Sequence, residues 1–286
     1  MGRRQWHVSS ALITGEAAVR LVLVSAALIV VTGLDTVEIA VVVASALWLV
    51  ALAVPTIRAA GAARADVDAG TLARHILQAM AAAVGAAVLV NGVPAVIRAT
   101  AGPDATDMAA PLFLAILITR APLLMPLQAF QGAAVSYFLD PRRPRSSSLV
   151  RLTMLVLTAA ATLAAAAGLL GPWLLGLLKP DYAVAAWLLV ALTLAAGLMG
   201  LLTLSGSVVL ALGRHGVYAA GWLTAAVVAC GTLVVGFRLV GLALDVGAVV
   251  ALAVGPLVGM AVHMVAVRHV LLRPGSPHLS ATAEST

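Results

Sequence analysis

Apolar runs long enough to cross a bilayer follow one another along most of this chain, with short polar stretches between them. A membrane-spanning helix needs about 20 predominantly apolar residues. Here 63% of the 286 residues are hydrophobic and only 10% are charged, which is far from the composition of soluble domains. The sequence therefore predicts an all-α polytopic membrane protein with about eight transmembrane helices.

The boundaries of the helices are predicted from Gly, Pro and Asn residues between the apolar runs. The expected spans are 11–33, 37–57, 72–91, 111–139, 152–170, 183–212, 217–240 and 246–267. The chain accordingly divides into a first pair of helices (1–57), a cytoplasmic linker (58–71), a six-helix part (72–272) and a disordered cytoplasmic tail (273–286).

Basic residues are unequally distributed when the loops are assigned alternately to the two sides of a membrane. One side collects twelve: Arg3, Arg4, Arg58, Arg64, Arg74, Arg142, Arg143, Arg145, Arg151, Arg214, Arg268 and Arg273. The other side collects Arg98, Lys179 and Arg238. Because cytoplasmic loops carry the excess of Lys and Arg, we expect a multi-pass protein of the cytoplasmic membrane with both termini in the cytoplasm. The net charge of +6 then requires no nucleic acid as a partner.

Arg120 lies near the middle of the fourth apolar run, and Pro122 and Pro126 follow it within two helical turns. A charge at the bilayer centre costs about 2.5–3.5 kcal/mol on insertion scales. Each proline removes an amide donor and kinks a helix. This combination is typical of a transport site, although a purely structural kink produces the same pattern.

A fixed acidic partner or a hydrated cavity that binds an anion would offset the cost of burying Arg120. The one acid expected at membrane depth is Glu16, and Arg20 follows it by one turn, in the order that favours an ion pair. The sequence therefore favours the cavity, in which case Arg120→Ala abolishes transport and leaves folding intact or improved. Glu16 and Arg20 form either a neutralising pair near the interface or, in a functional interpretation, a cationic site with Glu16 as a coupling group.

Further polar residues lie on or near the helix of Arg120. On a helical wheel Gln131 lies about 20° and Gln128 about 80° from Arg120, so the three form a polar stripe. Upstream, the run from Asn91 to Pro94 predicts a helix break. We expect this break and the two prolines of the fourth helix to take part in gating.

The sequence gives little support for an enzyme. Membrane-embedded hydrolases need paired acids, a Ser/His arrangement or metal ligands at membrane depth. Ser205 and Ser207 have no evident histidine base in their sequence context, and no phosphate-binding loop is present. Gly255, Gly259 and His263 form one stripe on the last helix, which predicts close helix packing with His263 as an interhelical hydrogen-bonding residue. We expect neither a metal nor a cofactor.

Several short motifs resemble, in order and spacing, landmarks of bacterial polysaccharide flippases of the multidrug/oligosaccharidyl-lipid/polysaccharide exporter superfamily. They are 91–94 (NGVP), 119–123 (TRAPL), 171–173 (GPW), 181–182 (DY) and 210–216 (LALGRHG), followed by Trp222. The resemblance implies that residues 72–272 form the second six-helix lobe and residues 1–57 the last pair of the first lobe. About four N-terminal helices would then be missing, and a truncated gene, a wrongly assigned start and a partner chain that supplies these helices are all open alternatives.

The resemblance also implies transport of a lipid-linked oligosaccharide, whose diphosphate joins a polyprenyl tail to sugars. Arginine suits phosphate best, so Arg120 is the first expected contact and Arg20 the second, with Gln128 and Gln131 as a hydrogen-bonding wall. A small-molecule exporter of the same superfamily would instead favour an apolar, aromatic cavity. A membrane scaffold that transports nothing is the third alternative.

Overall fold

The computed structural model describes residues 6–30, 34–46, 68–100, 106–139, 145–178, 182 and 184–271. All the regular elements in these ranges are helices, which agrees with the predicted all-α fold. The chain divides into two compact units, 1–68 and 69–286.

The first unit contains two helices that pack against each other, α1 (Trp6–Val30) and α2 (Leu34–Ser45). Small side chains face the contact, because Ala27, Ala40 and Ala44 are buried while the larger apolar residues around them are exposed. The second predicted helix was expected to reach residue 57, and residues 47–57 lie outside the described ranges.

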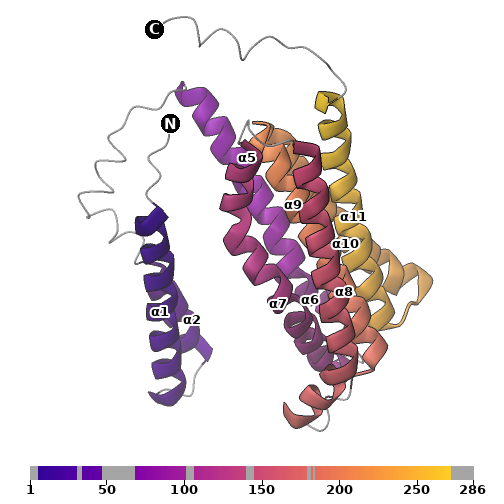
Figure 1. Cartoon of the computed structure of the whole chain (residues 1–286). Helices are drawn as coiled ribbons and strands as arrows, with labels where there is room; N and C mark the ends of the chain where they lie inside the picture. The colour runs from indigo at the N-terminus through magenta and orange to yellow at the C-terminus, as the bar shows by residue number, and fades with distance from the viewer. Residues whose placement is uncertain are drawn as a thin grey trace, which may run out of the picture. The chain divides into compact units, whose positions relative to one another are not determined.

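The second unit is a bundle of long helices (Figure 1). Its elements are α5 (Ala69–Ala87), η1 (Val88–Gly92), α6 (Val93–Thr100), α7 (Thr106–Leu139), α8 (Arg145–Leu178), α9 (Ala186–Ala211), α10 (His215–Val235), η3 (Gly236–Val240) and α11 (Leu244–Leu271). Within the described residues they form six spans that are long and apolar enough to cross a membrane. The chain is therefore a multi-pass membrane protein.

Helix α9 lies at the centre of this bundle. In its most apolar window 78% of the residues are buried, against at most 39% in the other five spans. The outer helices expose large apolar side chains such as Leu77, Leu155 and Val227. Lipid tails solvate such surfaces, so the burial pattern is that of a central helix surrounded by helices with one lipid-facing side.

Two predicted helix ends are wrong. The expected break from Asn91 to Pro94 is a π-helical turn, η1, after which the helix continues as α6 to Thr100. The helix expected to end at residue 170 continues through Pro172 as far as Leu178. Proline disfavours a helix because a carbonyl loses its donor, and membrane helices tolerate this where neighbouring groups satisfy that carbonyl.

The predicted packing stripe on α11 is confirmed. A Cβ atom on Gly255 would lie 2.6 Å from the Ala225 carbonyl oxygen, and one on Gly259 would lie 2.5 Å from that of Gly221. Any side chain at these two positions would therefore force α10 and α11 apart. The predicted turn between α9 and α10 is also present, where Gly213 adopts a φ of +69°.

Candidate functional site

Arg120 projects from α7 into the bundle, and its side chain is buried with 7% exposed. Its Nη1 donates hydrogen bonds to the carbonyl oxygens of Leu89, at 2.9 Å, and Val90, at 3.2 Å. Both acceptors belong to the π-helical turn η1. The guanidinium group therefore fastens α7 to the point where α5 changes into α6.

The sequence around η1 explains why these two carbonyls accept a hydrogen bond from another helix. Pro94 has no amide hydrogen, so it cannot donate to Val90, four residues earlier, as an α-helix requires. Nor can it donate to Leu89, five residues earlier, as π-helical spacing would require. Leu89 is fully buried, so water does not replace the missing donor. Arg120 supplies it.

The sequence suggested either an acidic partner or a hydrated cavity for the Arg120 charge, and the structure shows neither of these among the residues it describes. The partner is fixed, but it consists of backbone carbonyls rather than an acid. Nη1 uses both of its hydrogens on the two carbonyls, and the structure records no hydrogen bond from Nη2 or Nε to any described residue. Three donors of the guanidinium group remain for another ligand.

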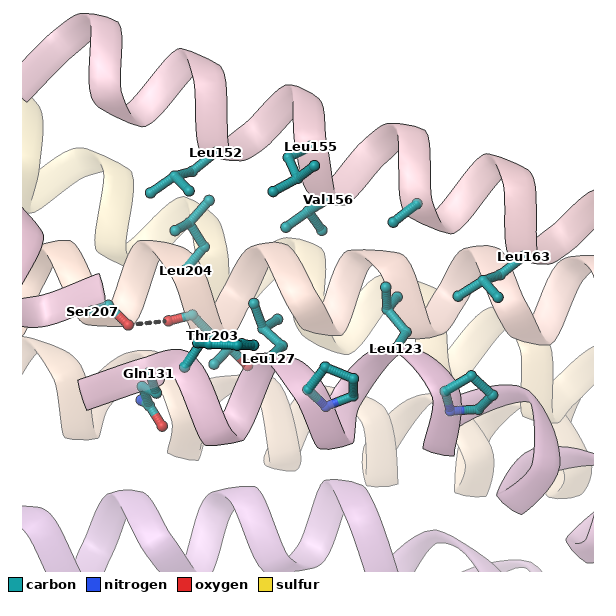
Figure 2. A pocket seen from close by; sticks show the side chains of 14 residues that line it. Leu123, Leu127, Gln131, Leu152, Leu155, Val156, Leu163, Thr203, Leu204 and Ser207 are labelled. Carbon is teal, nitrogen blue, oxygen red and sulfur yellow. Dashed lines mark hydrogen bonds between the residues drawn. The ribbon is translucent and has the colours of Figure 1, made fainter. Parts of the chain in front are cut away.

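A cavity of about 490 Å³ lies between α7, α8 and α9 (Figure 2). Its lining is mostly apolar and consists of Pro122, Leu123, Pro126, Leu127, Phe130, Gln131, Leu152, Leu155, Val156, Ala159, Leu163, Thr203, Leu204 and Ser207. This volume is in the range of small-molecule sites. Arg120 is not among the lining residues, so the structure does not place the predicted cation in this cavity.

Pro122 and Pro126 form part of the cavity wall, and both are exposed. Helix α7 continues through both of them to Leu139, so neither ends the helix. Their missing amides still deprive the carbonyls of Ile118 and of Pro122 itself of their normal donors. The predicted role of the two prolines in gating stays a prediction.

The polar groups of the cavity are mostly engaged within their own helix. Ser207 Oγ donates to the Thr203 carbonyl oxygen at 3.0 Å, as Figure 2 shows. Thr203 Oγ1 donates to the Met199 carbonyl oxygen, also at 3.0 Å. Because each hydroxyl has a single hydrogen, neither offers a donor to a ligand without giving up a backbone partner.

The predicted polar stripe of α7 is only partly brought together. Gln131 lines the cavity, and its Nε2 lies 3.4 Å from the hydroxyl oxygen of Tyr218 on α10. Gln128 is exposed and is not part of the cavity lining. Asn91, in η1, is also exposed, whereas Pro94 is half-buried.

Glu16 and Arg20 form an ion pair on α1, as their spacing predicts. Arg20 Nη2 also lies 3.4 Å from Ser45 Oγ, at the end of α2. Ser45 in turn donates to the carbonyl oxygen of Val41. The pair thus joins the two helices of the first unit, and its role in substrate binding or coupling stays a prediction.

Sequence reasoning missed the partner of Ser205. Its Oγ lies 3.0 Å from Nδ1 of His263, a residue 58 positions away on α11. His263 Nε2 lies 3.3 Å from the carbonyl oxygen of Tyr218, which confirms His263 as an interhelical hydrogen-bonding residue. Both Ser205 and His263 are buried, at 3% and 0% exposed, so a substrate has no access to this serine. Within the described residues, no group of three His, Cys, Asp or Glu residues is placed to hold a metal ion.

The chain is similar to uncharacterized proteins of mycobacteria. Uncharacterized protein Rv1510 of Mycobacterium tuberculosis is 35% identical over 267 residues, which cover 93% of this chain and 60% of the relative. Uncharacterized protein Mb3654 of Mycobacterium bovis is 34% identical over 267 residues, with 93% and 61% covered. The chain therefore spans about three fifths of the length of the curated relatives it matches. No protein-family model and no solved structure matches it.

Proposed function

We propose that this chain is part of a flippase that moves a lipid-linked oligosaccharide across the cytoplasmic membrane. The observation that carries the proposal is the arrangement around α7. This helix contributes a buried arginine with unused donors and also walls a largely apolar cavity. A polyprenyl diphosphate sugar needs both features, a cation for its phosphates and an apolar surface for its tail.

In this proposal the cavity between α7, α8 and α9 holds part of the polyprenyl tail. Its lining is almost entirely apolar, and the hydroxyls of Thr203 and Ser207 are engaged with carbonyls of α9. The exposed wall residues Pro122, Pro126 and Phe130 give the tail a route from the lipid. The diphosphate binds elsewhere, because the cavity offers few donors.

Arg120 is the proposed diphosphate contact. Its Nη1 holds the two carbonyls of η1, and its Nη2 and Nε are the donors that a phosphate oxygen would take. Phosphate binding by the remaining edge of the guanidinium group would leave the carbonyl contacts in place. Gln128 and Gln131 on the same helix complete the proposed polar wall, and the expected part of Arg20, with Glu16 as its ion-pair partner, in phosphate binding stays a prediction.

The orientation of the proposed transporter follows from the positive charge of its loops. Residues near Ser147 and His278 are expected in the cytoplasm, and residues near Asp104 and Asp181 outside. After Cys230→Ser, single cysteines at these positions can be labelled in intact cells with an impermeant maleimide. Labelling at position 147 without labelling at position 104 would show that the chain has the opposite orientation to the one proposed.

A small-molecule exporter is the second candidate, and the apolar lining of the cavity favours it. Phe130 is the aromatic side chain in that lining. Such an exporter needs no phosphate contact, so its activity would not depend on the charge of Arg120.

Filling the cavity tests the proposal. Ala159→Trp on α8 puts a large ring into the cavity, whereas Ala161→Trp adds the same volume on an exposed part of the same helix, outside the lining. We expect the first variant, but not the second, to fail in complementing a strain that lacks its own lipid-linked oligosaccharide flippase. Full complementation by Ala159→Trp contradicts the proposed tail site. Loss of drug efflux without loss of complementation identifies the small-molecule exporter instead.

A further inference from the structure

His263 lies in a fully enclosed position between three helices. It projects from α11 between Ser205 on α9 and Tyr218 on α10, and none of its surface is exposed. Space for the imidazole comes from Gly221, where a Cβ atom would overlap His263 Nε2. The ring of Tyr218 lies nearly parallel to it, with 6.2 Å between ring centroids and 7° between planes.

The partners of the two ring nitrogens restrict where the hydrogens lie. A carbonyl oxygen only accepts, so the contact with Tyr218 requires a hydrogen on Nε2 of His263. The other nitrogen, Nδ1, faces Ser205 Oγ, which also lies 2.9 Å from the carbonyl oxygen of Leu202. The single hydroxyl hydrogen of Ser205 can serve Nδ1 or Leu202, but not both.

This hydrogen count allows two states. With neutral His263, the Ser205 hydroxyl donates to Nδ1 and leaves the Leu202 carbonyl. With doubly protonated His263, Nδ1 donates to Ser205 Oγ, and the hydroxyl donates to Leu202. We propose that His263 is a buried proton-binding site in which rotation of the Ser205 hydroxyl accommodates one proton taken from water. The lone pair of Nδ1 forms the new N–H bond, and every hydrogen-bonding group of the protonated state has a partner.

The surroundings determine when the proton binds. Of the described residues that contact His263, Tyr218 is the one with a titratable side chain. The other contacts, Ser205, Gly206 and Gly221, are uncharged. The one carboxylate in the described parts of α9, α10 and α11 is Asp245, 18 residues from His263 and thus about 27 Å along the helix.

Positively charged residues near these helices lie toward their ends, as with Arg214 just before α10 and the exposed Arg268 on α11. A buried imidazolium without a counter-charge is costly. Protonation therefore favours an arrangement in which α10 separates from α9 and α11 enough to admit water beside the imidazolium while the contact with Ser205 is kept, and deprotonation favours the closed bundle.

Tyr218 connects this site to the cavity. Its carbonyl accepts from His263, its ring stacks on the imidazole, and its hydroxyl oxygen contacts Gln131 in the cavity lining. A helix separation that follows protonation therefore displaces a residue that holds the cavity wall. Proton exchange at His263 would thus couple to transport, a step that rests on the proposed function, whereas the proton site itself does not.

The proton site can be tested without a transport assay. Imidazole ¹⁵N spectra of the chain in lipid nanodiscs, compared with those of His263→Gln, assign the His263 signals and report their protonation between about pH 5 and pH 8. We expect the His263 signals to show reversible proton uptake as the pH is lowered. We also expect Ser205→Ala, which removes the acceptor for protonated Nδ1, to lower the ratio of protonated to neutral His263 about tenfold at a given pH.

Two variants on the same helix serve as controls. Ser205→Thr keeps the hydroxyl and should titrate as the unmodified chain does, and Ser207→Ala removes a hydroxyl that does not contact His263. If His263 stays neutral down to pH 5, or if Ser205→Ala and Ser207→Ala titrate alike, the proton site is wrong.

Transport at several pH values then tests the coupling. His263→Gln should remove the pH dependence of the transport rate measured in proteoliposomes. An unchanged pH dependence contradicts the coupling. If His263 titrates but the unmodified chain moves no lipid-linked oligosaccharide in proteoliposomes, the proton site stands and the proposed function fails.

Discussion

The two arginines that the sequence places within membrane helices are accommodated in opposite ways. Arg20 has an exposed side chain, 45% accessible, and pairs with Glu16 one turn away on the same helix. Arg120 is buried and pairs with two carbonyls of another helix, 31 and 30 residues away in sequence. One charge is neutralised locally by an acid, and the other is held by dipoles of a distorted backbone.

The difference shows that a buried charge and a distorted helix can supply each other's missing hydrogen-bond partners. The π-helical turn η1 and Pro94 leave carbonyls without helical donors, and Arg120 lacks an acid. Together they satisfy both groups, whereas either alone would carry an unpaired polar group inside the bundle. Arg120 therefore belongs to the fold of the second unit, whatever its part in binding substrate.

The largest expected effect is that of Arg120→Ala. The buried carbonyl of Leu89 and the half-buried carbonyl of Val90 would lose a charged donor, which lowers the free energy of unfolding by about 2–4 kcal/mol. This reverses the expectation from sequence alone, which was an intact or improved fold. Thermal unfolding in detergent measures the change, with the exposed Gln128→Ala on the same helix as the control. An unchanged melting temperature for Arg120→Ala would show that the carbonyl contacts contribute nothing to stability.

Pro94→Ala should weaken the dependence on Arg120. The new amide can donate to Val90 within the helix, so Arg120→Ala should destabilise this background by about 1–2 kcal/mol less than it destabilises the unmodified chain. The four melting curves of the double-mutant cycle give this coupling. If the stability changes of the two single variants add up to that of the double variant, Pro94 is not the reason that the carbonyls need Arg120.

Arg20→Ala should have a smaller effect, about 1 kcal/mol or less. The Arg20 side of its ion pair with Glu16 is exposed, and i,i+4 pairs of this kind contribute little. The comparison with Arg120→Ala is made in the same melting experiment. A loss as large as that of Arg120→Ala would mean that the pair with Glu16, or the contact with Ser45, holds the first unit together.

The smallest effect on stability is expected for the double replacement of Pro122 and Pro126 by Ala. These prolines face the cavity, and the change returns amide donors to α7. The melting temperature should stay near that of the unmodified chain, while complementation by the proposed flippase should decrease. Full complementation by the double variant contradicts a role of the two prolines in gating.

Much of the helical architecture follows from the length of the apolar runs, and two predictions, one confirmed and one wrong, show the limits of this inference. The stripe of Gly255 and Gly259 predicted close packing because small residues at helical spacing leave room for a neighbouring helix. Pro172 predicted a helix end that does not exist, because tertiary surroundings decide whether a proline is tolerated.

The candidate site was harder to predict. Glu16 and Arg20 are recognisable as a pair because helical geometry relates neighbours in sequence. Pro94 indicates that a carbonyl four or five residues before it lacks a helical donor, but nothing in the sequence relates Leu89 and Val90 to Arg120. Ser205 and His263 are similarly remote, and only the packing of α9, α10 and α11 brings them together.

The enclosure of His263 also constrains the order in which this sequence can change during evolution. A side chain at position 221 would overlap the imidazole, and a Cβ atom at position 206 would lie 2.8 Å from the ring of Tyr218. A lineage can therefore acquire alanine at position 221 only after the histidine has been replaced by a smaller residue. The reverse order passes through an intermediate in which α10 and α11 no longer pack. Substitutions at these positions should be historically contingent on one another, and His263 and Gly221 should be lost as a pair.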